Sequence, residues 1–412
     1  METVSCSITR KGKRLPLCFR VTTINDVPDC LIIEILLRLP LKSAKHCMLV
    51  SKHWYALMST PYFAHRFLQL NYTSVLLMSY EDFDNGIKKL LVTYQKWIFR
   101  SQALSLSVLP CDYLPCEPEA EPASVVASCQ DLLLCCSRLG SKSVYFICNP
   151  TTGRWTQLPP SPPPHKQTRH GFIFQGCGTS FKYAVVRIPY FAELRFCNDL
   201  KVQIFISDSA NWSEKLLTCR SKVFGWPLLN CSGIPHKGML FWISCFLNVL
   251  IGIDPFNEGE SPRLIDLPPG AFSIRINKSL AVCKGILRLL EIKDDFTKDV
   301  LSIRVWDLKD YEQVEWCLEH DISFFGLQSK NPTWFQCKQS VKLLASDSNN
   351  GDIVYFMMGR STVVSCNLHM QTLDVICDNI IVEAFDKAFV YALPWQPTFI
   401  PSLPLQNRCY DI

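Results

Sequence analysis

Side chains that could do chemistry are few and scattered in this 412-residue chain. Three of the eight histidines, His46, His53 and His65, lie close together near the N-terminus, and the others are dispersed singly. The acidic pair at Asp294 and Asp295 falls in a predicted turn, where carboxylates are more often solvated than paired for acid–base catalysis. No H-E-x-x-H, G-x-S-x-G, G-x-x-x-x-G-K-[ST] or G-x-G-x-x-G motif occurs. The sequence therefore predicts binding rather than catalysis, with no catalytic residue, metal ligand or cofactor.

The 21 cysteines do not form the pattern of a disulfide framework or a zinc site. They are spread along the chain without a C-x-x-C pair, and the adjacent Cys135 and Cys136 are predicted on opposite faces of a strand. The first residues lack the apolar core of a signal peptide. We therefore expect a reducing compartment, the cytoplasm, the nucleus or both, in which these thiols act as small hydrophobic groups.

Composition indicates a globular protein, with 48% hydrophobic and only 19% charged residues. The net charge of +5 is small and the basic residues are scattered, apart from a cluster at residues 10–14. This cluster is a weak candidate for a nuclear-import signal, and a solvated, disordered N-terminal arm is the favoured prediction. Neither a nucleic acid nor a membrane is therefore predicted as a partner. The longest apolar run, residues 238–253, is shorter than the roughly 20 residues that span a bilayer, and it contains Ser244 and Asn248. We predict a two-stranded hairpin there.

Most of the chain has the pattern of strands and turns. From about Leu70 to about Leu393, short β-branched and aromatic runs alternate with Gly, Pro, Asn and Asp. Two strand candidates followed by a turn residue recur five times, and the turn residues are Asn149, Asp208, Asp254, Asp307 and Asn367. Each unit holds about four strands in about fifty residues, which is the spacing of Kelch-type blades. With a further unit from residues 72–97, we predict a β-propeller of about six blades rather than a pair of irregular β-sandwiches.

A proline-rich stretch, LPPSPPPHKQTRH at residues 158–170, interrupts this pattern. Such a stretch can be a polyproline ligand for an aromatic groove. Its place between two predicted units favours a loop that connects two blades.

The N-terminal segment has a helical pattern instead. From Asp29 to Leu39, apolar residues cover most of a helix, and one narrow strip through Glu34 and Arg38 is polar. A proline precedes this helix and the next, and further helices are predicted at about residues 42–50 and 52–59. A bundle of under fifty residues buries too little surface to cover all of these apolar groups. One face is therefore predicted to be covered by the rest of the chain or by a partner protein.

Residues 24–63, INDVPDCLIIEILLRLPLKSAKHCMLVSKHWYALMSTPYF, resemble an F-box. The positions that match its pattern in order and spacing are Pro28, Leu31, Glu34, Ile35, Leu36, Arg38, Leu39, Pro40, Lys42, Ser43, Val50, Lys52, Trp54, Leu57, Pro61, Tyr62 and Phe63. The β-rich remainder resembles the F-box-associated, Kelch-like domain of plant F-box proteins, notably in CNPTTGRWTQLP, FKYAVVRI, VQIFISDSANW, EWCLEHDI and the terminal IPSL.

This resemblance implies a substrate-recognition adaptor of a Skp-cullin-F-box ubiquitin ligase, which leads a target protein to ubiquitination and degradation. The F-box would bind a Skp-type protein and, through it, cullin and RING subunits, while the propeller would bind an unknown protein substrate. The implied Skp-facing residues are Pro28, Leu31, Ile35, Leu36, Leu39, Pro40, Val50 and Trp54. The alternatives are an F-box scaffold without a ligase role, and a propeller enzyme or lectin.

The predicted organisation has four parts. They are an N-terminal arm at 1–23, a helical F-box domain at 24–70, the propeller at 71–400 and a tail at 401–412. The F-box differs from its family's usual pattern at several positions. Ala44 and His46 replace the usual Leu and Arg of the second helix, Ser51 replaces the common Cys, and Val27 precedes Pro28 where Leu is usual.

Overall fold

The chain divides into two compact units, residues 1–72 and 73–412. The computed structural model describes residues 24, 27–71, 74–82, 88–94, 120, 123–163, 168–177, 180–189, 197–223, 232–244, 248–257, 261–270, 277–295, 300–329, 341–348, 350–359, 362–377, 382–392, 395, 397–400 and 403. The arm expected at 1–23, with its basic cluster, lies outside the described residues, as does most of the tail expected at 401–412.

The first unit is a bundle of four helices. They are α1 (Asp29–Leu37), α2 (Leu41–Cys47), α3 (Lys52–Met58) and α4 (Pro61–Asn71). Pro28 and Pro40 precede α1 and α2, as predicted, because proline lacks the N–H that a first helical turn leaves unpaired. The first helix ends before Leu39, where it was predicted to end, because a residue that precedes a proline disfavours the helical conformation. The sequence pattern did not predict α4 as a separate helix.

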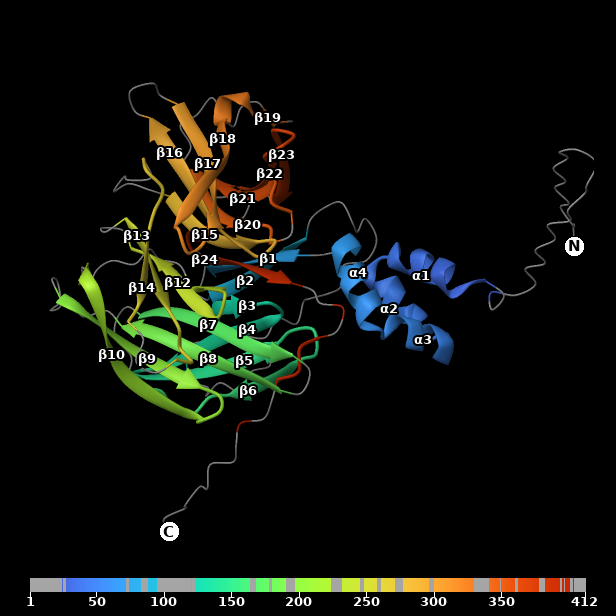
Figure 1. Cartoon of the computed structure of the whole chain (residues 1–412), viewed down its shortest axis with the longest axis horizontal. Coiled ribbons are helices and arrows are strands. Elements are labelled where there is room, and N and C mark those ends of the chain that lie inside the picture. Colours follow the sequence, from blue (N-terminus) through green and yellow to red (C-terminus); the bar gives the residue numbers. More distant parts are fainter. Residues whose placement is uncertain are drawn as a thin grey trace, which may run out of the picture. The chain divides into compact units, whose positions relative to one another are not determined.

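The second unit is built from antiparallel sheets (Figure 1). Five sheets have four or five strands. The first two sheets are β3 (Ser124–Cys129), β4 (Leu132–Leu139), β5 (Lys142–Asn149) and β6 (Arg154–Gln157), and then β7 (Thr168–Cys177), β8 (Ser180–Pro189), β9 (Cys197–Ile206) and β10 (Asn211–Val223). The next two are β11 (Ile234–His236), β12 (Met239–Ile243), β13 (Val249–Ile253) and β14 (Arg263–Asp266), and then β15 (Asn277–Cys283), β16 (Ile286–Asp295), β17 (Val300–Asp310) and β18 (Glu315–Ser323). The fifth is β20 (Val341–Ser346), β21 (Ile353–Met358), β22 (Thr362–Asn367) and β23 (Thr372–Cys377), and β19 (Gln328–Ser329) pairs with β23 in parallel. We call these five sheets the complete blades.

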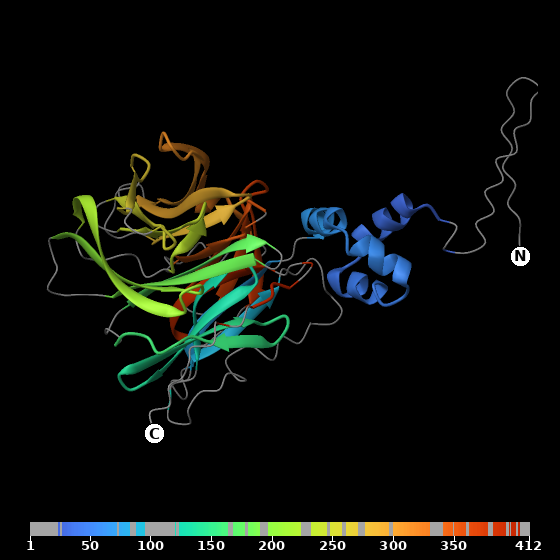
Figure 2. The same ribbon diagram turned by 60° about the horizontal axis from the view of Figure 1, so that its bottom comes forward.

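A sixth sheet joins the two ends of this unit. Its described strands are β1 (Ser74–Asp82), β2 (Lys88–Tyr94) and β24 (Val382–Ala392), with β1 in the middle. The pairing of β1 with β24 confirms the prediction that the last strand, near Ala388, closes the ring by joining an early one. Figure 2 shows the red β24 beside the blue β1.

The sheets follow one another around a ring. The first strand of each complete blade contacts the first strand of the next, through β3, β7, β11, β15 and β20, and β24 then contacts both β20 and β3. This is a β-propeller, as predicted. The expected number of about six four-stranded blades is corrected to five complete blades, because the closing sheet has three described strands.

The predicted repeat corresponds to the second and third strands of each complete blade. The predicted hairpin at residues 238–253 is confirmed as the antiparallel pair β12 and β13. Asn149, Asp254 and Asn367 are turn residues, since each side chain accepts a hydrogen bond from a backbone N–H two or three residues later, at 2.9, 2.8 and 2.9 Å. Asp208 also lies in a turn, between β9 and β10.

The fifth predicted turn residue, Asp307, was wrong. It lies inside β17 and is only 4% exposed. Its carboxylate pairs with Arg288, and the turn follows at Asp310, which accepts the backbone N–H groups of Glu312 and Gln313, both at 2.8 Å. A single aspartate after an apolar run can end the strand or form an ion pair with a residue of the neighbouring strand. The sequence alone does not distinguish these two cases.

The core lies between facing blades. One cluster joins the blade β3–β6 to the blade β7–β10 through side chains such as Ile147, Phe172, Val185 and Phe205, all buried. The proline-rich stretch connects these two blades, because it runs from the end of β6 to β7, as predicted; residues 164–167 within it lie outside the described part. The ten cysteines whose side chains the structure describes are free thiols.

Candidate partner-binding surface of the helical unit

The helical unit has a small core of its own. Its buried side chains are Ile32, Leu36, Leu37, Ala44, Met58, Phe63 and Phe67. Phe63 and Phe67, one turn apart on α4, stack with ring centroids 5.8 Å apart. The core therefore takes one face of α1, the face that carries Ile32 and Leu36.

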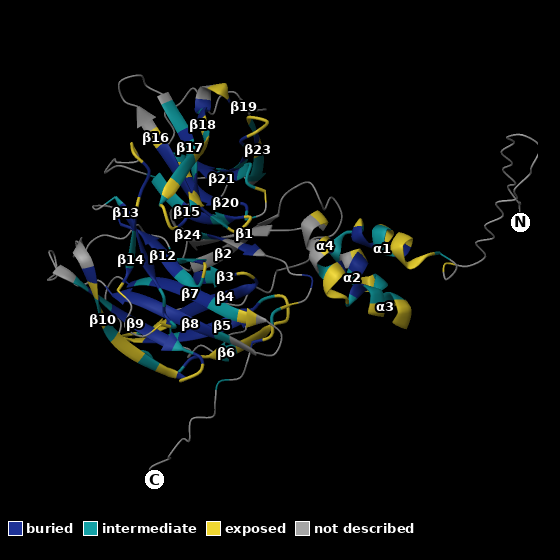
Figure 3. Ribbon diagram, in the orientation of Figure 1, coloured by how far each residue is buried: buried dark blue, intermediate teal, exposed yellow. Residues whose placement is uncertain are grey.

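The opposite face of α1 is apolar and open. Leu31 is 53% exposed and Ile35 is 54% exposed, and their spacing of four residues puts them on one side of the helix. Val50, in the connection between α2 and α3, is 66% exposed. Figure 3 colours each residue by its burial, and exposed segments of α1 and α3 are yellow there. Apolar groups at such exposure are typical of a surface that a partner covers.

Polar contacts hold this surface in place at its edges. His53 Nε2 lies 2.9 Å from Asp29 Oδ1, so the start of α3 is tied to the start of α1. Arg38 and Glu34 form an exposed ion pair at 3.2 Å on the polar strip of α1. The hydroxyl of Ser51 accepts the backbone N–H of Trp54 at 3.1 Å and so caps α3. Burial lowers the pKa of Lys45 on α2.

The eight residues predicted to face a Skp-type protein fall into three groups by exposure. Pro28, Leu31, Ile35 and Val50 are exposed, Leu39, Pro40 and Trp54 are half-buried, and Leu36 is 1% exposed. The first group is available to a partner. Leu36 belongs to the core of the unit, so a change there acts on folding before it acts on binding.

The sequence reasoning missed several large exposed side chains of this unit, among them Leu49 and Tyr55. Leu49 is 83% exposed and Tyr55 is 56% exposed. Leu49 is adjacent in sequence to the predicted Val50, and Tyr55 is adjacent to Trp54, so their positions could have suggested them. The sequence did not show that Leu49 is exposed, because α2 was predicted to continue to residue 50. In the structure α2 ends at Cys47, and both Leu49 and Val50 are exposed in the connection to α3.

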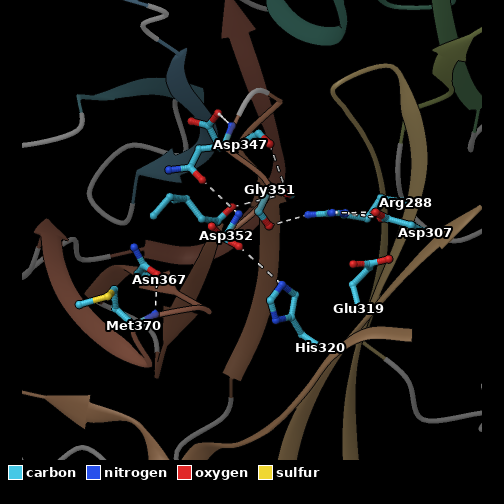
Figure 4. Close-up of polar contacts among 12 residues, drawn as sticks. Arg288, Asp307, Glu319, His320, Asp347, Gly351, Asp352, Asn367 and Met370 are labelled. Carbon is cyan, nitrogen blue, oxygen red and sulfur yellow. Dashed lines mark hydrogen bonds and ion pairs between the residues drawn. The ribbon is translucent and has the colours of Figure 1, made fainter. Parts of the chain in front are cut away.

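In the propeller, a buried ion pair lies within the blade β15–β18, and its arginine also bonds to the next blade (Figure 4). Arg288 of β16 binds Asp307 of β17 through two parallel hydrogen bonds, Nε to Oδ1 at 2.6 Å and Nη2 to Oδ2 at 3.0 Å. Its third group, Nη1, donates to the carbonyl oxygen of Gly351 in the next blade. Two exposed partners extend the network, with Lys309 bound to Glu319 at 2.7 Å. Each of the three nitrogen atoms of this guanidinium therefore donates a hydrogen bond.

Neither a metal centre nor a spanning helix is found in the part of the chain that the structure describes. Within those residues, no group of three or more His, Cys, Asp or Glu side chains could hold a metal ion. A search of the same residues for a helix long and apolar enough to cross a bilayer gave none.

Comparison with known proteins agrees with both units. Residues 24–66 match the F-box domain, and residues 98–389 match the family described as F-box protein At3g26010-like, beta-propeller. The chain is 26% identical over 345 residues to F-box protein At5g49610 of Arabidopsis thaliana, covering 80% of this chain and 88% of that one. It is 22% identical over 391 residues to putative F-box/kelch-repeat protein At1g15680 of the same plant, covering 89% and 88%.

A helical F-box followed by a β-propeller defines the class of F-box proteins with a propeller domain. Because the second match spans most of the chain, this protein belongs to the At3g26010-like family of F-box proteins. Among solved structures, TolB from Acinetobacter baumannii is similar with a TM-score of 0.41 and 9% identity, covering 83% of this chain and 73% of that one.

Proposed function

We propose that this protein is a substrate-recognition adaptor of a Skp-cullin-F-box ubiquitin ligase, acting in the cytoplasm, the nucleus or both. The F-box binds a Skp-type protein, which links it to cullin and RING subunits. The propeller binds a target protein, and ubiquitin transfer belongs to the partner subunits rather than to this chain. Membership of the F-box family supports this proposal.

The observation that carries the proposal is the open apolar face of α1. Leu31 and Ile35 have no cover within the described helical unit, although Ile32 and Leu36 on the other face are buried. The exposed half of each of these side chains adds nothing to the folding of the unit, and its burial against a partner contributes about 25 cal/mol per Å². Leu31, Ile35 and Val50, with Pro28 beside them, therefore make up the proposed Skp-binding surface. Leu39, Pro40 and Trp54 form its half-buried border.

Isothermal titration calorimetry of the full chain with a plant Skp-type protein tests this. Ile35→Asp puts a charge into the proposed interface, where burying it without a partner costs several kcal/mol. Since each tenfold change in affinity is about 1.4 kcal/mol, we expect a loss of a hundredfold or more. The matched control is Glu34→Ala, which removes an exposed i,i+4 pair worth about 0.2 to 0.5 kcal/mol and should bind nearly as the original chain does.

Leu36→Asp is the comparison that separates folding from binding. It places a charge in the core of the helical unit, so we expect loss of helical circular dichroism together with loss of binding. Ile35→Asp should keep the helical signal. Equal binding by Ile35→Asp would rule out this surface. Absence of binding by the unmodified chain would rule out the adaptor role as well.

A further inference from the structure

A second buried arginine of the propeller has the same setting as Arg288 but lacks its counter-ion. Arg187 lies on β8, the second strand of its blade, as Arg288 lies on β16. The cross-strand neighbour on the third strand is Asp307 for Arg288 and Gln203 for Arg187. Where one blade supplies a carboxylate, the other supplies a neutral amide.

The amide does not replace the missing carboxylate. The Nε2 group of Gln203 donates to Glu214 on β10 at 2.6 Å, and its Oε1 has no hydrogen-bond partner. The Glu214 carboxylate is engaged on that side and with Lys201 at 2.9 Å. Arg187 therefore receives no carboxylate from its own blade among the described residues.

The guanidinium of Arg187 has one edge filled and one edge empty. It is 0% exposed, and Nη1 donates to the carbonyl oxygen of Pro162 at 3.0 Å. Among the described residues, Nε and Nη2 have no hydrogen-bond partner. These two N–H groups point the same way and form the edge with which Arg288 grips Asp307 (Figure 4). Within the described residues, Arg187 is the one arginine or lysine with buried N–H groups left unpaired.

Aromatic rings and polar groups lie close to the guanidinium of Arg187. The Cζ atom of Arg187 lies 5.4 Å from the ring centre of Tyr145 and 5.6 Å from that of Trp212. The hydroxyl of Tyr145 is 3.0 Å from Nε2 of His170, which is the cross-strand neighbour of Arg187 on β7. The indole N–H of Trp212 donates to the carbonyl oxygen of Pro159 at 3.1 Å, so the proline-rich connection covers the group.

Burial of a guanidinium without an anion is costly, because charged groups inside proteins are paired or bound to a ligand. The two rings offset part of this cost through cation–π contacts. They leave the two N–H groups unpaired. We propose that Nε and Nη2 of Arg187 bind the carboxylate of a small organic acid at this empty edge, beside the rings of Tyr145 and Trp212, whose centres are 5.6 Å apart. The propeller then holds a small-molecule site that is separate from its binding of a protein target.

Thermal unfolding of the full chain in sodium acetate or sodium benzoate tests this, with sodium chloride at equal ionic strength and the uncharged acetamide as references. Acetate or benzoate should raise Tm with a saturable dependence on concentration, since a ligand that binds only the folded state stabilises it. Chloride and acetamide should not. Arg187→Lys keeps the charge but cannot make two parallel bonds, so the apparent affinity should fall about tenfold or more.

If Arg187→Lys fails to fold, a second variant still tests the proposal. The double exchange Gln203→Glu with Glu214→Gln keeps the composition and the hydrogen bond between these two side chains, and it places a carboxylate opposite Arg187. The new Glu fills the empty edge as Asp307 does, so carboxylates should no longer raise Tm. Glu214→Gln alone is the control and should respond as the original chain does. No carboxylate response by the unmodified chain, or an equal response by the double exchange, would overturn the proposal.

Discussion

The backbone N–H of Thr398 donates a hydrogen bond of 2.7 Å to the carboxylate of Asp131, a residue 267 positions earlier in the chain. The hydroxyl of Thr398 donates to the same carboxylate, and the amide of Asn149 bridges it to the carbonyl oxygen of Thr398, at 2.8 and 2.9 Å. Ile400 then packs into the core between the first two complete blades. The segment that follows β24 is therefore bound to the blade β3–β6 through Thr398 and Ile400.

Asp131→Asn should destabilise the propeller. Asp131 is 1% exposed, and its carboxylate accepts three hydrogen bonds that an amide cannot all accept. The loss of a buried hydrogen-bonding group costs about 1 to 3 kcal/mol. Urea unfolding followed by tryptophan fluorescence measures this. The exposed Asp266→Asn is the control, and equal stability of the two variants would show that the segment around Thr398 adds nothing.

Removal of residues 388–412 should open the ring. It takes away the pairing of β24 with the first half of β1, from Ser74 opposite Ala392 to Met78 opposite Ala388. An unpaired strand edge is a template for association, so we expect oligomers in size-exclusion chromatography with light scattering, and a lower Tm. Removal of residues 404–412 alone is the control. A monomer with unchanged Tm after the longer deletion would argue against closure by this segment.

The thiols should differ widely in their reaction with iodoacetamide. Burial raises the pKa of Cys129 and of Cys366 to about 12, whereas Cys30 is exposed on α1. Only the thiolate reacts, and at pH 8 a thiol of this pKa is ionised in about one molecule in ten thousand. Peptide mass spectrometry should find Cys30 modified and the other two unmodified until urea is added. Similar labelling of all three in the folded protein would contradict their burial.

The propeller should lose stability in mild acid. Burial, with a smaller contribution from Lys237, lowers the pKa of His236 from 6.5 to about 4. In the unfolded chain this group takes up a proton below about pH 6.5, whereas in the folded chain it does so only near pH 4. Stability is therefore full above pH 6.5 and falls by up to about 3 kcal/mol between pH 6.5 and 4.

His236→Phe checks this assignment. The ring lies 6.3 Å from that of Phe241 and 5.9 Å from that of Tyr311, so a phenylalanine keeps the aromatic packing and removes the titration. Tm measured from pH 7.5 to 4 should fall less steeply in this variant. A residual slope is expected from His320, whose pKa burial also lowers. An unchanged slope would assign the acid sensitivity to other groups.

Sequence reasoning predicted elements with a local cause and missed contacts between distant ones. The hairpin of β12 and β13 has its own apolar runs and a polar interruption at Asn248, so it could be predicted. The turns at Asn149, Asp254 and Asn367 could be predicted for the same reason. Asp307 was placed in a turn because its partner, Arg288, lies on a different strand and no local pattern connects them.

The candidate surface shows the same limit. The spacing in α1 indicated two apolar faces but not which of them the bundle buries, because that depends on Phe63 and Phe67 of α4, a helix that the sequence pattern did not separate from the rest. Leu36 was therefore grouped with Ile35 as a contact residue. The empty edge of Arg187 had no signal in the sequence, since it depends on the neutral Gln203 lying across from it on β9.

The pairing of β1 with β24 affects how this protein folds during its synthesis on the ribosome. Roughly three hundred residues separate the two strands, and at about 5 to 20 residues per second their synthesis takes about 15 to 60 seconds. Throughout that interval the edge of β1 that awaits β24 stays without its partner, while the blades between them can already form. The ring can therefore close only after β24 has been synthesised, and a chaperone that shields the edge of β1 would act during that interval.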